Sequence, residues 1–314
     1  MAENTVKKIA TRESYGNSLK ELAEEFPNLV VLDADLAAAT KTGIFRKAYP
    51  DRHIDCGIAE SNMMGVAAGL SLVGKIPFVS SFAMFAAGRA FEQVRNSIGY
   101  PHLNVKIGAT HAGITVGEDG ATHQCNEDIA LMRTIPGMVV MCPSDDVEAR
   151  AAVRAALEYE GPVYIRFGRA AVPVINDHPG YHFEIGKGTV VREGKDVTIV
   201  ATGICVDSAL GAAKMLEEEG ISAEVVNIYT IKPLDEEIII NSAKKTGKVV
   251  TVEEHSVIGG LGSAVCDCLC ANHPVPVKKV GMQDVFGESG SAAALVEKYG
   301  LDAKGVYKSV KEFL

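Results

Sequence analysis

The stretch LNVKIGATHAGITVGEDGATHQ, residues 103–124, joins two kinds of sequence that together decide the fold. Its apolar first part, Leu103–Ala109, predicts a buried strand. The remainder, Thr110–Gln124, holds two histidines and two adjacent carboxylates among glycines, whereas an ordinary connection is short and simple. A loop carries function when a rigid scaffold holds it, and the carboxyl ends of strands in α/β sheets line ligand crevices. We therefore expect an α/β fold with its chemistry in this loop.

Strand-like apolar runs alternate with helical patterns on both sides of this stretch. In the first block, strands are predicted at 29–32, 76–80, 103–109, 138–142 and 163–167, with helices at 13–25, 60–72, 85–98 and 145–160. In the second block, strands are predicted at 197–201, 223–227, 249–252 and 277–280, with helices at 206–219, 235–245 and 263–272 and two short helices at the end. This alternation predicts mostly parallel sheets with helices on both faces.

The alternation breaks between residues 170 and 195, a segment with two prolines and four glycines. We place a linker there because domain boundaries fall in such segments. The predicted fold class is α/β with two domains, each a mostly parallel sheet flanked by helices. The first domain is expected at 1–172, the linker at 173–190 and the second domain at 191–314.

Composition excludes several classes of protein. The chain has 314 residues, 47% of them hydrophobic and 23% charged, which is typical of a soluble globular protein. Its net charge of -9 argues against a nucleic-acid partner. The longest apolar runs are too short to span a membrane, and the N-terminal residues lack the apolar core of a signal peptide. Seven scattered cysteines favour a reducing cytoplasm over a disulfide framework.

The cysteines at 266, 268 and 270 resemble a metal cluster at first sight. They lie in a predicted helix, where Cys266 and Cys270 share a face and Cys268 points away. One helix cannot bring all three to one ion, so we interpret them as buried structural thiols.

The loop side chains His111, Glu118, Asp119 and His123 admit three interpretations on chemistry alone. They could form an ordinary polar surface, a metal site or a cradle for a polyhydroxylated ligand. Their spacing matches no compact metal motif such as H-E-x-x-H. Glycines within the loop would let the backbone turn sharply and approach a ligand.

Other candidates lie next to predicted strand and helix ends. Glu60 is expected in the first turn of a helix that is almost wholly apolar. Such a helix is expected to be buried on most sides, and the Glu60 carboxylate with it. Phe82 and Phe85 follow a strand, where they either pack in the core or form a shelf for a planar ring. Arginine at such ends suits a phosphate, although a lone one is more often a surface charge. The arginines in question are Arg12, Arg166 and Arg169.

Taken in order, these segments resemble the C-terminal half of transketolase over essentially the whole chain. The matching pieces are ATRESYG at 10–16, LDADL at 32–36, GIAESNM at 57–63, SFAMF at 81–85, ATHAGITVGEDGATHQ at 109–124 and FGR at 167–169. The resemblance implies a thiamine-diphosphate pyrimidine-binding domain followed by a transketolase C-terminal domain. It also implies transfer of a two-carbon ketol unit from a ketose phosphate to an aldose phosphate, within the pentose phosphate pathway.

The family's diphosphate and Mg²⁺ motif, GDG with a later Asn, has no match here. The nearest segment, Glu118-Asp119-Gly120, lacks the first glycine. The resemblance therefore implies that Mg²⁺ and the diphosphate lie on a separate N-terminal subunit. We expect a two-fold dimer of this chain joined by two such subunits, a heterotetramer.

The resemblance also implies roles for single residues. Near the cofactor, Glu60 matches the glutamate at N1′ of the aminopyrimidine, Phe82 and Phe85 match its aromatic shelf, and Asp35 matches an aspartate of unspecified role. Asp119 and His123 match contacts to the donor sugar, and Arg12, His111 and Arg169 match the clamp on the acceptor phosphate. Where the family has a further phosphate-binding serine, this chain offers Ala39 or Thr40, of which only Thr40 has a hydroxyl.

Two alternatives remain open at this point. The chain could be the β-type subunit of another thiamine-diphosphate enzyme, such as a 2-oxo-acid dehydrogenase or a deoxyxylulose-phosphate synthase, although these differ in the loop at 109–124. It could also be a non-catalytic binding protein that keeps the fold.

Overall fold

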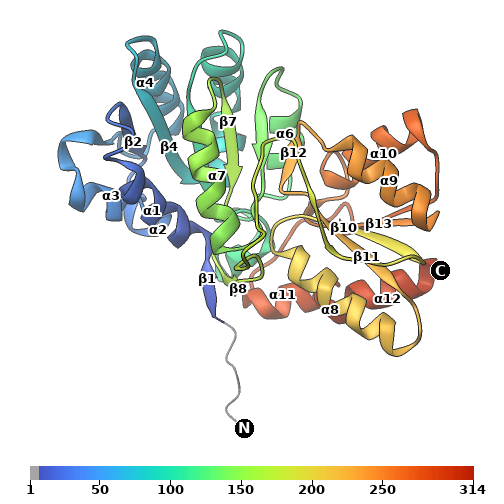
Figure 1. The fold of residues 1–314 in the computed structure, drawn as a ribbon. Coiled ribbons are helices and arrows are strands. Elements are labelled where there is room, and N and C mark those ends of the chain that lie inside the picture. The colour runs from blue at the N-terminus through green and yellow to red at the C-terminus, as the bar shows by residue number, and fades with distance from the viewer. Residues whose placement is uncertain (1–6) are drawn as a thin grey trace.

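The computed structural model describes residues 7–314 and contains two large sheets (Figure 1). The first sheet has seven strands in the order β12-β6-β7-β5-β4-β2-β3, and all neighbours are parallel except β12 and β6. Its strands are β2 (Leu29–Asp33), β3 (His53–Asp55), β4 (Ile76–Phe82), β5 (Lys106–Thr110), β6 (Val139–Met141), β7 (Val163–Arg166) and β12 (Thr230–Lys232).

Helices cover both faces of this sheet, as the alternation predicts. Along β2, Leu29 and Val31 pack into the cluster formed with α1 and α7, while Val30 and Leu32 pack into the cluster formed with α4. One face carries α1 (Thr11–Leu22), α3 (Gly43–Ala48) and α7 (Asp146–Glu158). The other carries α4 (Glu60–Leu72), α5 (Phe91–Gln93), α6 (Asp128–Arg133) and the segments η2 (Met84–Arg89) and η3 (Val94–Gly99).

The second sheet has five strands in the order β14-β13-β10-β11-β9, and only β9 is antiparallel to its neighbour. The strands are β9 (Thr189–Arg192), β10 (Val197–Ala201), β11 (Ala223–Asn227), β13 (Val249–Ser256) and β14 (Val277–Met282). One face packs on α8 (Cys205–Glu218), α11 (Ala292–Lys298) and α12 (Ala303–Phe313), and the other on α9 (Glu236–Thr246) and α10 (Leu261–Asn272). This is the second α/β unit that the sequence predicts.

The two sheets share an apolar core. Val200 and Val226 of the second sheet belong to the same buried cluster as Val140 of the first. The strand β12 lies in the second half of the chain and pairs antiparallel with β6, so it extends the first sheet. A small sheet of β1 (Lys8–Ala10) and β8 (Ala171–Pro173) holds the start of α1 beside the end of the first unit. The loops of one domain therefore lie directly against the other domain.

Three local predictions are wrong. The single helix expected at 85–98 is broken at Ala90, and η2 and η3 on either side have the wider π-helical turn, which an average periodicity does not distinguish. Helix α4 is buried on one side only, and Leu72 and Val73 at its end are each 73% exposed. Of the three neighbouring cysteines, only Cys268 is buried, because it faces the core while Cys270 is exposed and Cys266 half-buried.

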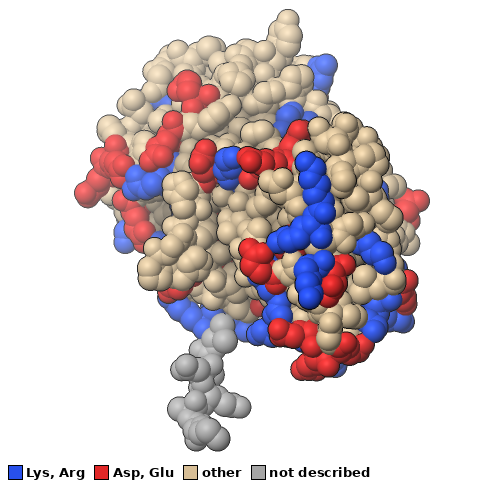
Figure 2. Space-filling view, turned by 45° about the vertical axis from the view of Figure 1, so that its right-hand side comes forward, with Lys and Arg blue, Asp and Glu red and all other residues tan. Residues whose placement is uncertain are grey.

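The sequence analysis did not predict several short elements, which are α2 (Ala37–Thr40), η1 (Pro50–Arg52), η4 (Ile114–Asp119), β1, β3, β8, β9, β12, α3 and α6. Within the described residues, none of the helices is both long and apolar enough to cross a membrane. On the face that Figure 2 presents, acidic and basic side chains are interspersed, so no field of one sign forms there.

Candidate active site

The predicted site residues gather at one edge of the first sheet. Strands β2, β4, β5 and β7 are parallel neighbours, so their carboxyl ends meet at this edge. Phe82 ends β4, His111 follows β5 and Arg169 follows β7 by three residues. Arg12 reaches the same edge from the first turn of α1. The sheet topology thus explains why residues far apart in sequence lie together.

Glu60 is the first residue of α4 and only 2% of it is exposed, which confirms the expected burial. Its Oε2 accepts a hydrogen bond from Nη1 of Arg89 at 2.9 Å. Arg89 itself is half exposed, and its guanidinium carbon lies 4.6 Å from the ring centre of Phe85. The sequence prediction missed Arg89, although its position four residues after Phe85 places it one helical turn away.

The aromatic side chains form a continuous stack with the two loop histidines. The rings of Phe82 and Phe85 lie 6.0 Å apart at an angle of 17°. His111 stacks on Phe82 at 3.9 Å, and His123 meets Phe85 edge-on at 5.4 Å. Each phenylalanine ring therefore packs against one histidine of the loop that the sequence analysis singled out.

His111 is neutral and holds an arginine in place. Its Nε2 lies 3.1 Å from Nη1 of Arg12, which can only donate, so Nε2 is the acceptor. Burial, with the positive charges of Arg12 and Arg169, lowers the pKa of His111 to about 3. The ring proton then resides on Nδ1, which faces Oγ1 of Thr110 at 2.9 Å. In this arrangement His111 orients Arg12 through its Nε2.

Arg12 and Arg169 bring two positive charges together. Arg12 also donates from Nη1 to the carbonyl oxygen of Ala39 at 2.9 Å, and its buried Nε has no hydrogen-bond partner among the described residues. Burial lowers the pKa of Arg12, and the charge of Arg169 lowers it further. Arg169 donates to the carbonyl oxygen of Val116. Two neighbouring guanidiniums with an unsatisfied N–H are suited to bind an anion.

The acidic part of the loop faces outward beside Arg169. The carboxylates of Glu118 and Asp119 lie 3.4 and 3.8 Å from Nη1 of Arg169, and both are exposed. The turns around them need glycine, because Gly117 and Gly120 have φ of +85° and +75°. The neighbouring His123 uses Nδ1 toward Oγ1 of Thr122 at 2.9 Å. Asp119 and His123 are therefore fixed at the mouth of the site with polar atoms available to a ligand.

Two expected residues have other surroundings. Asp35 lies after β2 with φ of +60°, and its N–H donates to Asp55, outside the contacts described above. Thr40 is fully buried, and its hydroxyl donates to Oδ2 of Asp33 at 2.8 Å. Thr40 is thus not free to replace a phosphate-binding serine.

Arg166, which the sequence grouped with the ligand-facing arginines, is buried at 5% exposure. Its Nε donates to the carboxylate of Asp128 at 2.9 Å. Arg166 ends β7 as the sequence indicates, but its side chain points into the protein, so it is neither the phosphate contact nor the surface charge that the sequence analysis considered.

The surroundings of Glu60 fit the pyrimidine end of thiamine diphosphate. A planar group with N–H donors, the Arg89 guanidinium, already lies over Phe85 and donates to Glu60. An aminopyrimidine ring that stacked on Phe85 would present a nitrogen to the same buried carboxylate. For a metal, the described residues hold no group of three or more His, Cys, Asp or Glu side chains placed to bind one.

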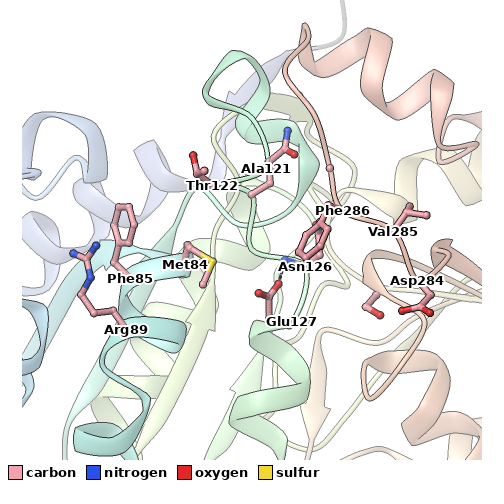
Figure 3. Close-up of a pocket in the computed structure, with 13 residues that line it drawn as sticks. Met84, Phe85, Arg89, Ala121, Thr122, Asn126, Glu127, Asp284, Val285 and Phe286 are labelled. Atoms are coloured by element: carbon pink, nitrogen blue, oxygen red, sulfur yellow. Dashed lines mark hydrogen bonds between the residues drawn. The ribbon is translucent and has the colours of Figure 1, made fainter.

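A cavity of about 710 Å³ opens beside this site (Figure 3). Phe85 and Arg89 form one wall, and Val285 and Phe286 of the second domain face them across the opening. Glu127 points into the space between these walls, and burial raises the pKa of its carboxyl. The site is therefore bordered by both domains.

Two family models match the chain, the transketolase pyrimidine-binding domain over residues 7–174 and the transketolase C-terminal domain over residues 186–306. The "Putative transketolase C-terminal section" of Methanocaldococcus jannaschii is 52% identical over 303 residues, which cover 96% of this chain and 95% of that protein. The "6-deoxy-6-sulfo-D-fructose transketolase subunit SqwH" of a Clostridium species is 49% identical over 301 residues, covering 96% and 93%.

Among solved structures, one described as "Split gene transketolase, inactive beta4 tetramer" has a TM-score of 0.89 and 58% identity, and covers 98% of each chain. The transketolase of Campylobacter jejuni has a TM-score of 0.82 and 25% identity, and this chain spans 47% of its length.

Proposed function

The chain belongs to the transketolase family, and we propose that it is the C-terminal subunit of a transketolase divided between two polypeptides. In this proposal the complex transfers a two-carbon ketol unit from a ketose phosphate to an aldose phosphate. The supporting observation is an unbroken series of side-chain contacts. It runs from Glu60 through Arg89, Phe85, Phe82 and His111 to Arg12, which lies beside Arg169.

At one end of the series, the residues suit the cofactor. Thiamine diphosphate, when bound, supplies the carbanion chemistry, and the protein supplies orientation and electrostatics. Glu60 would hold a proton at N1′ of the aminopyrimidine, and Phe85 would stack on its ring once Arg89 moves aside. Phe82 backs Phe85, and Asp35 at the adjacent strand end is proposed to line the cofactor. The diphosphate and Mg²⁺ would lie on the N-terminal subunit.

At the other end, the residues suit a charged sugar. Arg12 and Arg169 would bind the terminal phosphate with His111 holding Arg12, while Asp119 and His123 would contact hydroxyl groups near the reacting carbons. The relatives include subunits named for 6-deoxy-6-sulfo-D-fructose and for apulose 4-phosphate. Two arginines without a hydroxyl donor suit either a phosphate or a sulfonate.

We propose a heterotetramer of two such chains and two N-terminal subunits. Support comes from both ends of α4, where Ile58, two residues before Glu60, and Leu72 and Val73, at the other end of the helix, are at least 73% exposed. Large exposed apolar groups at a site are typical of an interface. The solved relative described as "Split gene transketolase, inactive beta4 tetramer" also supports association between copies of this chain.

Reconstitution tests the proposal. The purified chain should show no ketol transfer until the N-terminal subunit, thiamine diphosphate and Mg²⁺ are added. Glu60→Gln should lower turnover of the complex by roughly 10²- to 10⁴-fold, the usual contribution of a positioned proton-transfer group. Glu21→Gln, on the outer face of α1, is the matched control and should leave turnover unchanged.

Three outcomes would contradict the proposal. Ketol transfer by the chain alone would refute the divided site, and near-normal turnover of Glu60→Gln would remove Glu60 from the mechanism. Decarboxylation of pyruvate in place of ketol transfer would favour the synthase or 2-oxo-acid dehydrogenase alternative. This alternative is tested because a deoxyxylulose-phosphate synthase of Heliobacterium modesticaldum is 40% identical to the chain.

A further inference from the structure

The loop at 111–124 is anchored by the second domain at both of its ends. Near its start, the N–H of Thr115 donates to Oε1 of Glu254 at 2.6 Å. Near its end, Nε2 of Gln124 donates to the carbonyl oxygen of Glu288 at 2.9 Å. Glu254 lies in β13 and Glu288 lies before α11, so both anchors come from the other domain. Asp119 and His123 lie between these two points.

Glu254 is the more specific of the two anchors. It is 3% exposed, and its Oε2 lies 3.8 Å from Arg166, which is itself buried. Arg166 also donates to the carbonyl oxygens of Cys125 and Glu254. The loop base closes nearby, where the N–H of Gly113 donates to Cys125 at 2.9 Å. The buried Arg166–Glu254 ion pair thus ties both ends of the loop, near Gly113 and at Cys125, to β13.

The backbone at Gly113 is shaped to receive this carboxylate. Gly113 has φ of +75°, and a Cβ on it would collide with the Cδ of Glu254. Only glycine combines that conformation with that close approach. The fit between Gly113 and Glu254 therefore determines the direction in which the loop leaves β5, and with it the position of η4.

We propose that Glu254 is a positioning residue, through which the second domain sets the geometry of the loop that carries Asp119 and His123. It touches no substrate itself and acts through Thr115, Gly113 and Arg166. This inference rests on the proposed function for its consequence in catalysis, but the anchoring of the loop can be measured without any activity. It gives the second domain a role in the site.

The neighbouring residue Glu253 provides a matched control. It is also a fully buried glutamate of β13, but its side chain faces the other way and accepts hydrogen bonds from the N–H groups of Leu261 and Gly262 at 2.7 and 2.8 Å. Replacing either glutamate removes a buried carboxylate from the same strand. Only replacing Glu254 should release the loop.

Hydrogen exchange of the full chain tests the anchoring. In Glu254→Met the Thr115 amide should exchange roughly 10- to 100-fold faster, as the loss of a hydrogen bond to a charged acceptor predicts. Gly113→Ala, which displaces the carboxylate by collision, should give the same change if Glu254→Met does not fold. Glu253→Gln should leave the Thr115 amide protected. Unchanged exchange in folded Glu254→Met or Gly113→Ala, or equal acceleration in Glu253→Gln, would overturn the proposal.

Kinetics of the reconstituted complex test the consequence for catalysis. Glu254→Gln keeps an acceptor oxygen for Thr115, and it should recover part of the turnover lost in Glu254→Met while both variants bind the N-terminal subunit normally. The loss should fall on kcat and on the KM of the donor sugar, which Asp119 and His123 contact. Equal turnover in all variants, with the loop released, would refute the positioning role. Absence of ketol transfer in the unmodified complex would instead refute the proposed function and leave the exchange result standing.

Discussion

Replacing Arg12 with glutamine should weaken anion recognition far more than it weakens the fold. The two acceptors of Arg12, the carbonyl of Ala39 and Nε2 of His111, are neutral, and such hydrogen bonds contribute about 0.5–1.5 kcal/mol each. Removing the cation also removes two unfavourable contributions, the burial of a charge and its repulsion from Arg169, both of which lower the pKa of Arg12. These effects oppose one another, so we expect the free energy of unfolding to fall by about 1 kcal/mol.

The effect on a phosphorylated acceptor should be larger. A hydrogen bond between charged groups contributes about 1.5–3 kcal/mol, which corresponds to roughly 10- to 150-fold in the KM of that sugar. The assay is steady-state ketol transfer by the reconstituted complex, with a phosphorylated aldose and an unphosphorylated aldose of the same length compared as acceptors. The ratio of the KM changes for the two acceptors separates the loss of the phosphate contact from any general disturbance of the site.

Arg52→Gln is a suitable control for this measurement. Arg52 also donates only to neutral groups, the carbonyl oxygens of Ala23, Phe26 and Leu29, and burial likewise lowers its pKa. Its replacement should lower stability without changing the preference for a phosphorylated acceptor. If Arg12→Gln raises the KM of both acceptors equally, the two-arginine clamp is not an anion site and the reasoning fails.

Two predictions concern pH. Because the pKa of His111 is about 3, its imidazole should stay neutral from about pH 5 to pH 9, and its NMR signals should not titrate there; a midpoint near the ordinary value of 6.5 would contradict the geometry. Burial raises the pKa of Glu148 from its ordinary 4.5 to about 7, so folding favours the protonated form. The stability that this carboxyl contributes is therefore fully present below about pH 4.5 and is lost as the pH rises through about 7. Thermal unfolding between pH 5 and pH 8 should accordingly show a shallower decline in Glu148→Gln than in the unmodified chain, and parallel curves would contradict this assignment.

The main strands were predictable because their signal is local. In β2 the alternation of side chains between two clusters follows from a period of two in the chain itself. The loop at 110–124 could likewise be found from its density of titratable groups after an apolar run. Burial of Glu60 followed from its place at the start of an apolar helix.

What could not be predicted depends on contacts between distant segments. The three residues of β12 pair across the domain boundary with β6, and nothing in so short a run indicates this partner. The direction of an arginine side chain at a strand end depends on which charged groups of other segments lie near it. Arg166 points into the core because it forms ion pairs there with Asp128 and Glu254. Glu254 lies in β13 two residues beyond the strand predicted at 249–252, and nothing in the sequence singled it out.

At the proposed anion end of the site, a backbone carbonyl orients an arginine side chain. Asp33 is fully buried and accepts hydrogen bonds from the hydroxyls of Thr40 and Thr42, both at 2.8 Å. These contacts consume the hydroxyl that sequence comparison offers for phosphate binding, but they also fix the turn that presents the carbonyl of Ala39 to Arg12. In the proposed function, selection of an oxyanion at this end therefore depends on the placement of two guanidiniums by rigid neighbours, without a hydroxyl donor from Thr40.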